Sequence, residues 1–194
     1  MVVFQSRDPN PITSPAADPL PFMTATAPST LQRLGLGDFD NEMAATRRIL
    51  ARVPDEHFDW RPHAKSGTLG NLASHVASVI GLQNAVLRSD ELDILAPGGA
   101  RPEPATNNAE LLATFDRTVE SVREAIAAMP DDAAWYRTWT FRRGDVVIFQ
   151  LPKVAAFRGF GISHLVHHRG QLSVYLRLLD VPVPGMYGPS ADER

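Results

Sequence analysis

Residues 163–171 read Ser-His-Leu-Val-His-His-Arg-Gly-Gln and hold three of the six histidines of the chain. On an α-helix, which turns about 100° per residue, His164 and His168 lie about 40° apart on one face, whereas His167 lies about 60° to 100° to the side. Imidazoles four residues apart can bind one divalent ion together, because their Cβ atoms are about 5 to 6 Å apart. We therefore predict that His164 and His168 face inward, and that His167 is a surface or supporting group.

A third metal ligand is expected from another helix. His75 lies at the edge of the apolar stripe predicted for residues 66–89, whereas His57 and His63 lie in or near a loop. A single inward histidine is more often a hydrogen-bonded core residue than a ligand, and this alternative stays open for His75. Three buried imidazoles without partners would leave several unsatisfied polar groups at about 1 to 3 kcal/mol each, and one ion would satisfy them together. On spacing alone, a metal site and an ordinary core are equally favoured.

Apolar periodicity predicts four amphipathic helices, at about residues 38–53, 66–89, 107–129 and 152–179. Asn107, with Glu110 three residues later, predicts a capping box at the start of the third helix. The stretch 135–151 alternates bulky and polar residues around an Arg-Arg-Gly-Asp turn, which predicts a short β-hairpin or another ordered excursion. The predicted fold class is all-α: a four-helix bundle with this excursion before the last helix.

The N-terminal segment differs from the rest of the chain. Residues 1–28 contain six prolines among Ala, Ser, Thr and Asp and show no helical or strand period. We predict an extended or disordered arm over residues 1–30 and one bundle domain over residues 31–194. A translation start at Met23 is an open alternative.

Composition narrows the possible classes of function. The 194 residues are 44% hydrophobic and 21% charged, which is enough for one well-packed domain. A formal net charge of -3 gives no electrostatic footprint for nucleic acid. The absence of cysteine excludes thiolate-bound metals and a cysteine nucleophile, so that any metal must be bound by His, Asp or Glu. Because neither a secretory signal nor an apolar run of about 18 residues is found, no membrane partner and a cytoplasmic location are expected.

Three stretches of the sequence resemble the DinB-like family. Residues 164–171 are similar to its His-x-x-x-His-Arg-Gly-Gln motif, residues 65–75 resemble the segment that leads to its first ligand, and residues 176–192 resemble its C-terminal end. The resemblance, which covers about residues 38–192, implies a four-helix bundle in which the matched histidines bind nickel, zinc or a similar ion. Those residues are His75, His164 and His168. It also implies a homodimer, and it assigns no role to residues 135–151, which are expected to shape the site or to cover an edge.

An ion on three neutral imidazoles would be a Lewis acid or would activate a nucleophile. The resemblance implies a thiol S-transferase or a hydrolase that acts on a small electrophilic substrate, with a low-molecular-weight thiol as a candidate cofactor. Gln171 and Tyr175 are the candidates for contacting substrate or cofactor, although a helix-helix hydrogen bond for Gln171 and a core position for Tyr175 are favoured over those roles. Arg169 is expected to form a salt bridge, and Gly170 to permit close helix packing.

Two rival interpretations remain open. In the first, the ion only stabilises a non-catalytic, metal-binding stress-response bundle; a closed fourth protein ligand would favour it, whereas open coordination positions would favour an enzyme. In the second, the chain is an interaction scaffold whose histidines bind no metal. Imidazole ligands suit several ions, and zinc and nickel are the expected ones.

Overall fold

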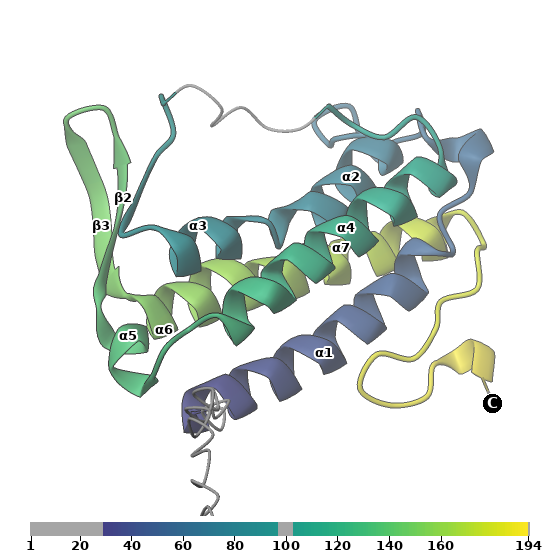
Figure 1. Ribbon diagram of the computed structural model, residues 1–194. Coiled ribbons are helices and arrows are strands. Elements are labelled where there is room, and N and C mark those ends of the chain that lie inside the picture. The colour runs from purple at the N-terminus through teal and green to yellow at the C-terminus, as the bar shows by residue number, and fades with distance from the viewer. Residues whose placement is uncertain (1–28, 97–102, 194) are drawn as a thin grey trace, which may run out of the picture.

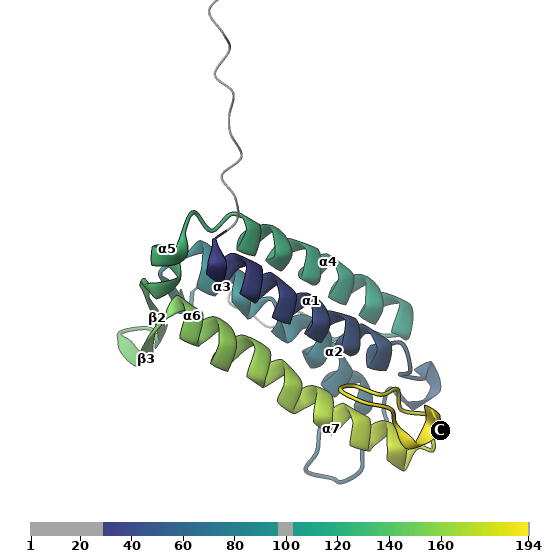
Figure 2. The ribbon, with the colours of Figure 1, turned by 90° about the horizontal axis from the view of Figure 1, so that it is seen from below.

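The computed structural model describes residues 29–96 and 103–193. Residues 1–28 of the predicted N-terminal arm lie outside the described residues, whereas its last residue, Thr30, belongs to the first helix. The main α-helices of the described residues are α1 (Thr30–Leu50), α2 (Leu69–Val79), α3 (Leu82–Arg88), α4 (Asn108–Ala127) and α7 (His164–Leu178). The other helical elements are η1 (Asp55–His57), α5 (Asp132–Tyr136), α6 (Lys153–Ala155), η2 (Ala156–Ser163) and η3 (Ala191–Glu193). Helix α1 packs against α4 and α7, and α2 packs against the same two helices (Figures 1 and 2). This arrangement is the predicted four-helix bundle.

Helix α1 begins eight residues earlier than the sequence predicted. The hydroxyl of Ser29 accepts a hydrogen bond from the Gln32 amide, and the Gln32 side chain accepts one from the Ser29 amide, which together form a capping box. The Gln32 side chain is buried and donates to carbonyls at the end of α4, at Ile126 and Ala127. The prediction was wrong because Gly35 and the following Gly37 weaken the local helical signal, whereas these tertiary contacts stabilise the helix.

The predicted second helix is divided into α2 and α3. Helix α2 ends with Ile80 as its C-cap, and α3 starts after Gly81. The predicted face is nevertheless the buried one: Val76 and Val79 in α2 and Gln83 in α3 are almost fully buried. Periodicity thus located the buried face but not the interruption.

Helix α4 follows the predicted stripe, with Leu111, Phe115 and Ile126 fully or almost fully buried. The Asn107 side chain accepts from the Glu110 amide at 2.9 Å, as the predicted capping box requires. The reciprocal half of that box was wrong, because the Glu110 carboxylate accepts its backbone hydrogen bond from Thr106.

The predicted excursion is a β-hairpin that belongs to a small sheet. Strands β2 (Thr138–Arg143) and β3 (Val146–Pro152) pair antiparallel, and Gly144 takes a positive φ of 57° in the turn. A third strand, β1 (Glu91–Asp93), pairs parallel with β2, so the order is β1-β2-β3. Figure 1 shows the hairpin standing at one end of the bundle, next to α3. The start of the excursion was wrong, since residues 135 and 136 belong to α5.

The last helical stretch runs from α6 through η2 into α7, over the range that the sequence predicted. Element η2 has π-helical geometry, which the periodicity did not predict. Element η2 lies close against α3: a Cβ atom on Gly161 would lie 2.6 Å from the Gln83 side chain, whose amide donates to the Phe157 carbonyl at 3.2 Å. The expected close packing at Gly170 was wrong, because nothing lies within 4 Å of a Cβ built there. Within the described ranges, no helix is long and apolar enough to cross a membrane.

Candidate metal centre

Three histidine side chains meet between α2 and α7. His75 comes from α2, His164 is the first residue of α7, and His168 follows one turn later. The ring centroids are 5.3 Å apart for His75 and His164, 4.5 Å for His75 and His168, and 4.8 Å for His164 and His168. One ring nitrogen from each can be chosen so that all three lie within 4.8 Å of one another. All three residues are half-buried, so each keeps part of its surface exposed to solvent.

Packing of the two helices fixes these positions. Val76 is fully buried next to His75 in α2, and Leu165 and Leu172 are fully buried in α7. These apolar residues face the core of the bundle, so the histidines beside them lie along the seam between the two helices. His167, in contrast, is exposed.

The three imidazole nitrogens fit a divalent ion that is intermediate between hard and soft, such as zinc or nickel. The Nε2 atoms of His164 and His168 are 2.9 Å apart. At bonds of about 2.0 to 2.1 Å, two nitrogens on one ion are separated by about 2.9 to 3.4 Å for angles between a right angle and a tetrahedral one. His75 completes the set within 4.8 Å, so a movement of about an ångström or two would bring its nitrogen to the same separation.

Gln171 forms a hydrogen bond with the His168 ring on the side away from His164. Its Oε1 atom lies 2.8 Å from Nδ1 of His168. An Nδ1–H that donates to this oxygen leaves the lone pair on Nε2, the nitrogen that faces His164. The expected helix-helix hydrogen bond of Gln171 was wrong, because this bond lies within α7 and the side chain is exposed.

Tyr175 lies one turn beyond Gln171 and is half-buried instead of filling the core. Its hydroxyl donates to the Gly67 carbonyl at 3.3 Å, and its ring contacts Trp60 edge to face at 5.8 Å. Both partners belong to the loop that leads into α2. Tyr175 therefore links this loop to α7, two turns beyond His168.

Arg169 points to the opposite side of α7 and forms the expected salt bridge. Its guanidinium is 2% exposed and lies 2.7 Å from the carboxylate of Glu42 in α1. It also donates to the Thr46 hydroxyl at 3.0 Å and to the Tyr187 hydroxyl at 2.6 Å. Tyr187 in turn donates to Glu42, and the desolvation of its hydroxyl at this contact, together with the hydrogen bond, raises the pKa of the Tyr187 phenol. The arginine of the histidine motif therefore anchors α7 to α1 and to the C-terminal tail.

Sequence reasoning missed an aromatic neighbour of the cluster. The ring of Phe160 in η2 lies 6.0 Å from the ring of His164. It also contacts Phe141 and Phe149 of the hairpin. A signal was present, because residues 160, 164 and 168 follow one another at four-residue steps.

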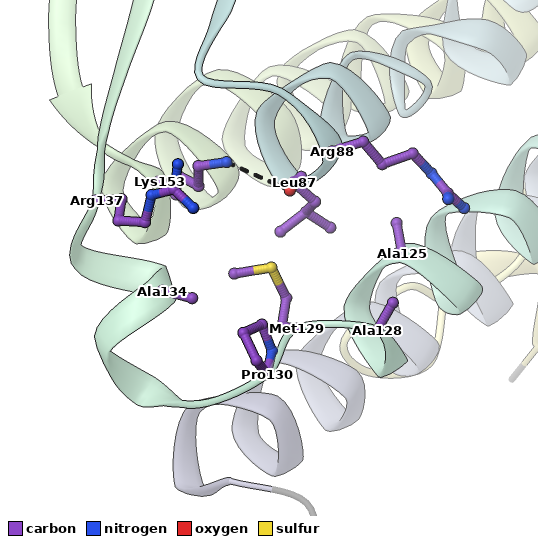
Figure 3. Close-up of a pocket in the computed structure, with 9 residues that line it drawn as sticks. All are labelled: Leu87, Arg88, Ala125, Ala128, Met129, Pro130, Ala134, Arg137 and Lys153. Atoms are coloured by element: carbon purple, nitrogen blue, oxygen red, sulfur yellow. Dashed lines mark hydrogen bonds between the residues drawn. The ribbon is translucent and has the colours of Figure 1, made fainter.

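A cavity of about 350 Å³, separate from the histidine cluster, lies at the C-terminal end of α3, with Lys153, Arg137 and Arg88 in its lining (Figure 3). Lys153 is 4% exposed and donates to the carbonyls of Leu87 and Ser89. Arg88 and Arg137 are also paired with carboxylates, those of Glu124 and Asp90. These cations hold α3 to its neighbours, so the cavity has no unpaired charge from them to offer to a ligand.

Fold and site together define a four-helix bundle with a cluster of three histidines between two of its helices. The chain belongs to the DinB superfamily, whose family model matches residues 38–172 and thus all three clustered histidines. A relative, the uncharacterized protein YrdA of Bacillus subtilis (strain 168), is 28% identical over 159 residues, which are 81% of this chain and 89% of YrdA.

Solved structures show the same fold. A DinB-like protein from Bacillus cereus ATCC 10987 matches with a TM-score of 0.61 and 20% identity, over 79% of this chain and 95% of that protein. The DinB-like protein YjoA from Bacillus subtilis matches with a TM-score of 0.59 and 16% identity, over 77% and 95% respectively. At these identities the similarity establishes the architecture and leaves the chemistry to the residues.

Proposed function

We propose that this chain is a metal-dependent enzyme that holds one divalent ion on His75, His164 and His168, with zinc or nickel as the expected ion. The observation that carries the proposal is the convergence of three ring nitrogens, from two helices, within 4.8 Å. Hydrogen bonds between the rings would also use some of these nitrogens. They would not account for the alignment of His168 by Gln171, which is the arrangement typical of a histidine ligand.

The composition of the cluster favours catalysis over a purely structural ion. Among residues 29–96 and 103–193, no carboxylate and no fourth histidine joins the group. Structural zinc sites have four protein ligands, whereas catalytic sites have three and leave a position for water or substrate. The half-buried cluster is also reachable from solvent.

We infer a transfer reaction in which a low-molecular-weight thiol attacks a small electrophile, with hydrolysis as the second candidate. When bound, the ion would supply Lewis acidity and lower the pKa of the attacking group. The cluster in the described part of the chain contains no Asp or Glu that could serve as a base. A thiol, with a pKa of about 8.5, needs less help than water to lose its proton, which favours transfer.

Gln171 and Tyr175 are proposed to contact the thiol or the substrate. The exposed Gln171 amide has donors left over after its oxygen engages His168. The half-buried Tyr175 follows His168 by two turns of α7 and contacts Trp60. A small molecule bound at the histidines and extending along α7 toward this loop would meet both side chains.

Metal content is the first test. Untagged protein should contain about one equivalent of zinc or nickel, and His75→Ala, His164→Ala and His168→Ala should each abolish tight binding in equilibrium dialysis. His167→Ala is the matched control and should retain it. Loss of binding in the control as well, or a metal-free wild type, would contradict the proposal.

Catalysis is tested next with a chromogenic aryl halide and a panel of low-molecular-weight thiols. A metal-dependent rate that disappears in His164→Ala supports a transferase, whereas ester or amide cleavage without thiol supports a hydrolase. Metal that raises the melting temperature without supporting either rate would identify the stress-response bundle, the non-catalytic alternative.

We also propose that the chain forms a homodimer through the edge of its sheet. Strand β3 pairs only with β2 among the described strands, and Val146, Val147 and Ile148 on it are 66%, 52% and 49% exposed. An exposed apolar edge strand is a template for pairing with another chain. Residues 146–152 carry no charge, so that two copies can pair antiparallel without repulsion between side chains of the strand. Light scattering should give a dimer that Val147→Lys converts to a monomer.

The control for this substitution is Leu34→Lys, at an apolar residue of α1 that is 63% exposed. It should leave the mass unchanged. A dimer that survives Val147→Lys would refute pairing through β3, and a monomeric wild type would refute the dimer itself.

A further inference from the structure

Three phenylalanines form a continuous aromatic surface between the hairpin and the last helical stretch. Phe141 of β2 and Phe149 of β3 are direct partners in the strand register, with ring centroids 5.2 Å apart. Phe160 of η2 lies 5.0 Å from the first and 5.4 Å from the second. We call Phe141, Phe149 and Phe160 the aromatic wall.

The aromatic wall packs against a fully buried tryptophan, Trp139. Trp139 is fully buried behind it, with its ring 6.1 Å from each of the three phenylalanine rings. The Trp139 indole N–H donates to the Ala85 carbonyl of α3 at 3.2 Å, which anchors the hairpin to the bundle. Buried Trp139 therefore already provides the core that the hairpin needs.

The register of the hairpin is interrupted beside the wall. The pairing shifts between Phe141 and Arg142, so that Ile148 has no partner in β2. Irregularities of this kind re-aim side chains and are over-represented next to active sites. Here the shift follows directly after the Phe141–Phe149 pair, at the edge of the wall.

The wall continues into the histidine cluster. Phe160 precedes His164 by four residues, and the two rings are 6.0 Å apart. His168 follows on the same helical row. All three wall residues are half-buried, in contrast to the fully buried Trp139, so part of each aromatic side chain remains accessible. A molecule whose reacting atom lies at the histidines would have this apolar surface within one helical turn.

We propose that the aromatic wall binds a neutral aryl group of the substrate, and that it thereby sets the specificity of the three-histidine site. This inference rests on the proposed function, because it places the reacting atom of the substrate at His75, His164 and His168. Aromatic rings pack favourably edge to face or offset-stacked on other rings, and the wall itself presents no charged group. The hairpin is thus the specificity element of the fold.

The test uses binding probes instead of turnover. The full chain is loaded with Co(II), and the visible absorption of the ion reports its binding and then the addition of acetohydroxamate or benzohydroxamate. The two probes share the same chelating group and differ by a phenyl ring. Because burial of an aromatic side chain is worth a factor of about 10 to 100 in affinity, benzohydroxamate should bind tighter by about that factor.

Phe160→Ala and Phe149→Ala should each reduce this preference several-fold while acetohydroxamate affinity stays constant. Phe160→Leu, which keeps most of the apolar volume, guards against misfolding and should give an intermediate preference. Tyr136→Ala removes an aromatic side chain that is 63% exposed and not part of the wall, and it should change nothing.

The outcomes distinguish failure of the proposed metal site from failure of aryl binding by the wall. A chain that fails to bind Co(II) overturns the proposed function and this inference with it. A chain that binds Co(II) but has equal affinity for both probes, or a preference that survives the wall substitutions, overturns the inference alone.

Discussion

Replacing Arg169 by Met should destabilise the protein by about 3 to 5 kcal/mol, because a carboxylate would be left in the interior without its cation. The Arg169 side chain is 2% exposed, and that of its partner Glu42 is 16% exposed. The substitution also removes hydrogen bonds to Thr46 and Tyr187. At about 2 to 4 °C per kcal/mol for a domain of this size, the melting temperature should fall by about 6 to 20 °C.

The assay is thermal unfolding of the metal-free chain followed by circular dichroism. The double variant Arg169→Met, Glu42→Met should recover most of the loss, since apolar residues of similar volume often replace a buried ion pair at little cost. The matched control is Arg47→Met, which breaks the ion pair with Asp116. Both side chains of that pair are about half exposed, so the substitution should cost at most about 1 kcal/mol. A loss below 1 kcal/mol for Arg169→Met, or a double variant as unstable as the single one, would refute this reasoning.

Three further predictions concern the site, the π-helical segment and the tail. Gln171→Leu should weaken metal binding by about 10- to 100-fold in a chelator competition with little change in melting temperature, because it frees the ring that the amide orients; unchanged affinity would remove its supporting role. Gly161→Ala should cost about 1 to 3 kcal/mol in urea unfolding, since its Cβ would lie 2.6 Å from a buried side chain, whereas Gly159→Ala, with nothing within 4 Å, should be neutral or stabilising. The Arg177 guanidinium lowers the pKa of Asp192 to about 2, so the stability that this carboxylate contributes should be present above about pH 4 and lost as the pH falls toward 2; Asp192→Asn should flatten the melting temperature over that window.

The sequence predicted the architecture because the apolar stripes are regular. The buried positions of α4 and the extent of the stretch from α6 to α7 follow from three- and four-residue spacing. The side-by-side placement of His164 and His168 follows from the same geometry. The proximity of His75 required only that α2 pack against α7, which the bundle architecture implies.

The remaining features depend on contacts that spacing does not encode. The start of α1 is decided by Gln32, whose partners lie more than 90 residues away. Strand β1 has three residues and is stabilised by pairing with a strand almost 50 residues later, so it has no local period. The π-helical segment η2 contains the close contact between Gln83 and Gly161, and one sequence without its fold cannot pair these two positions.

The length of η2 has a consequence for how this protein can change in evolution. A π-helical segment such as η2 contains more residues than an α-helix with the same number of turns. Deleting a single residue between 156 and 163 would allow ordinary α-helical bonding over about the same number of turns, so the hairpin and α7 would keep about the same relative rotation. Inserting a further residue would instead add about 100° between them and turn the hairpin away from the histidines. A one-residue deletion in this segment is therefore expected to be tolerated better than a one-residue insertion, and the number of helical turns is the inherited trait that keeps the two halves of the site in phase.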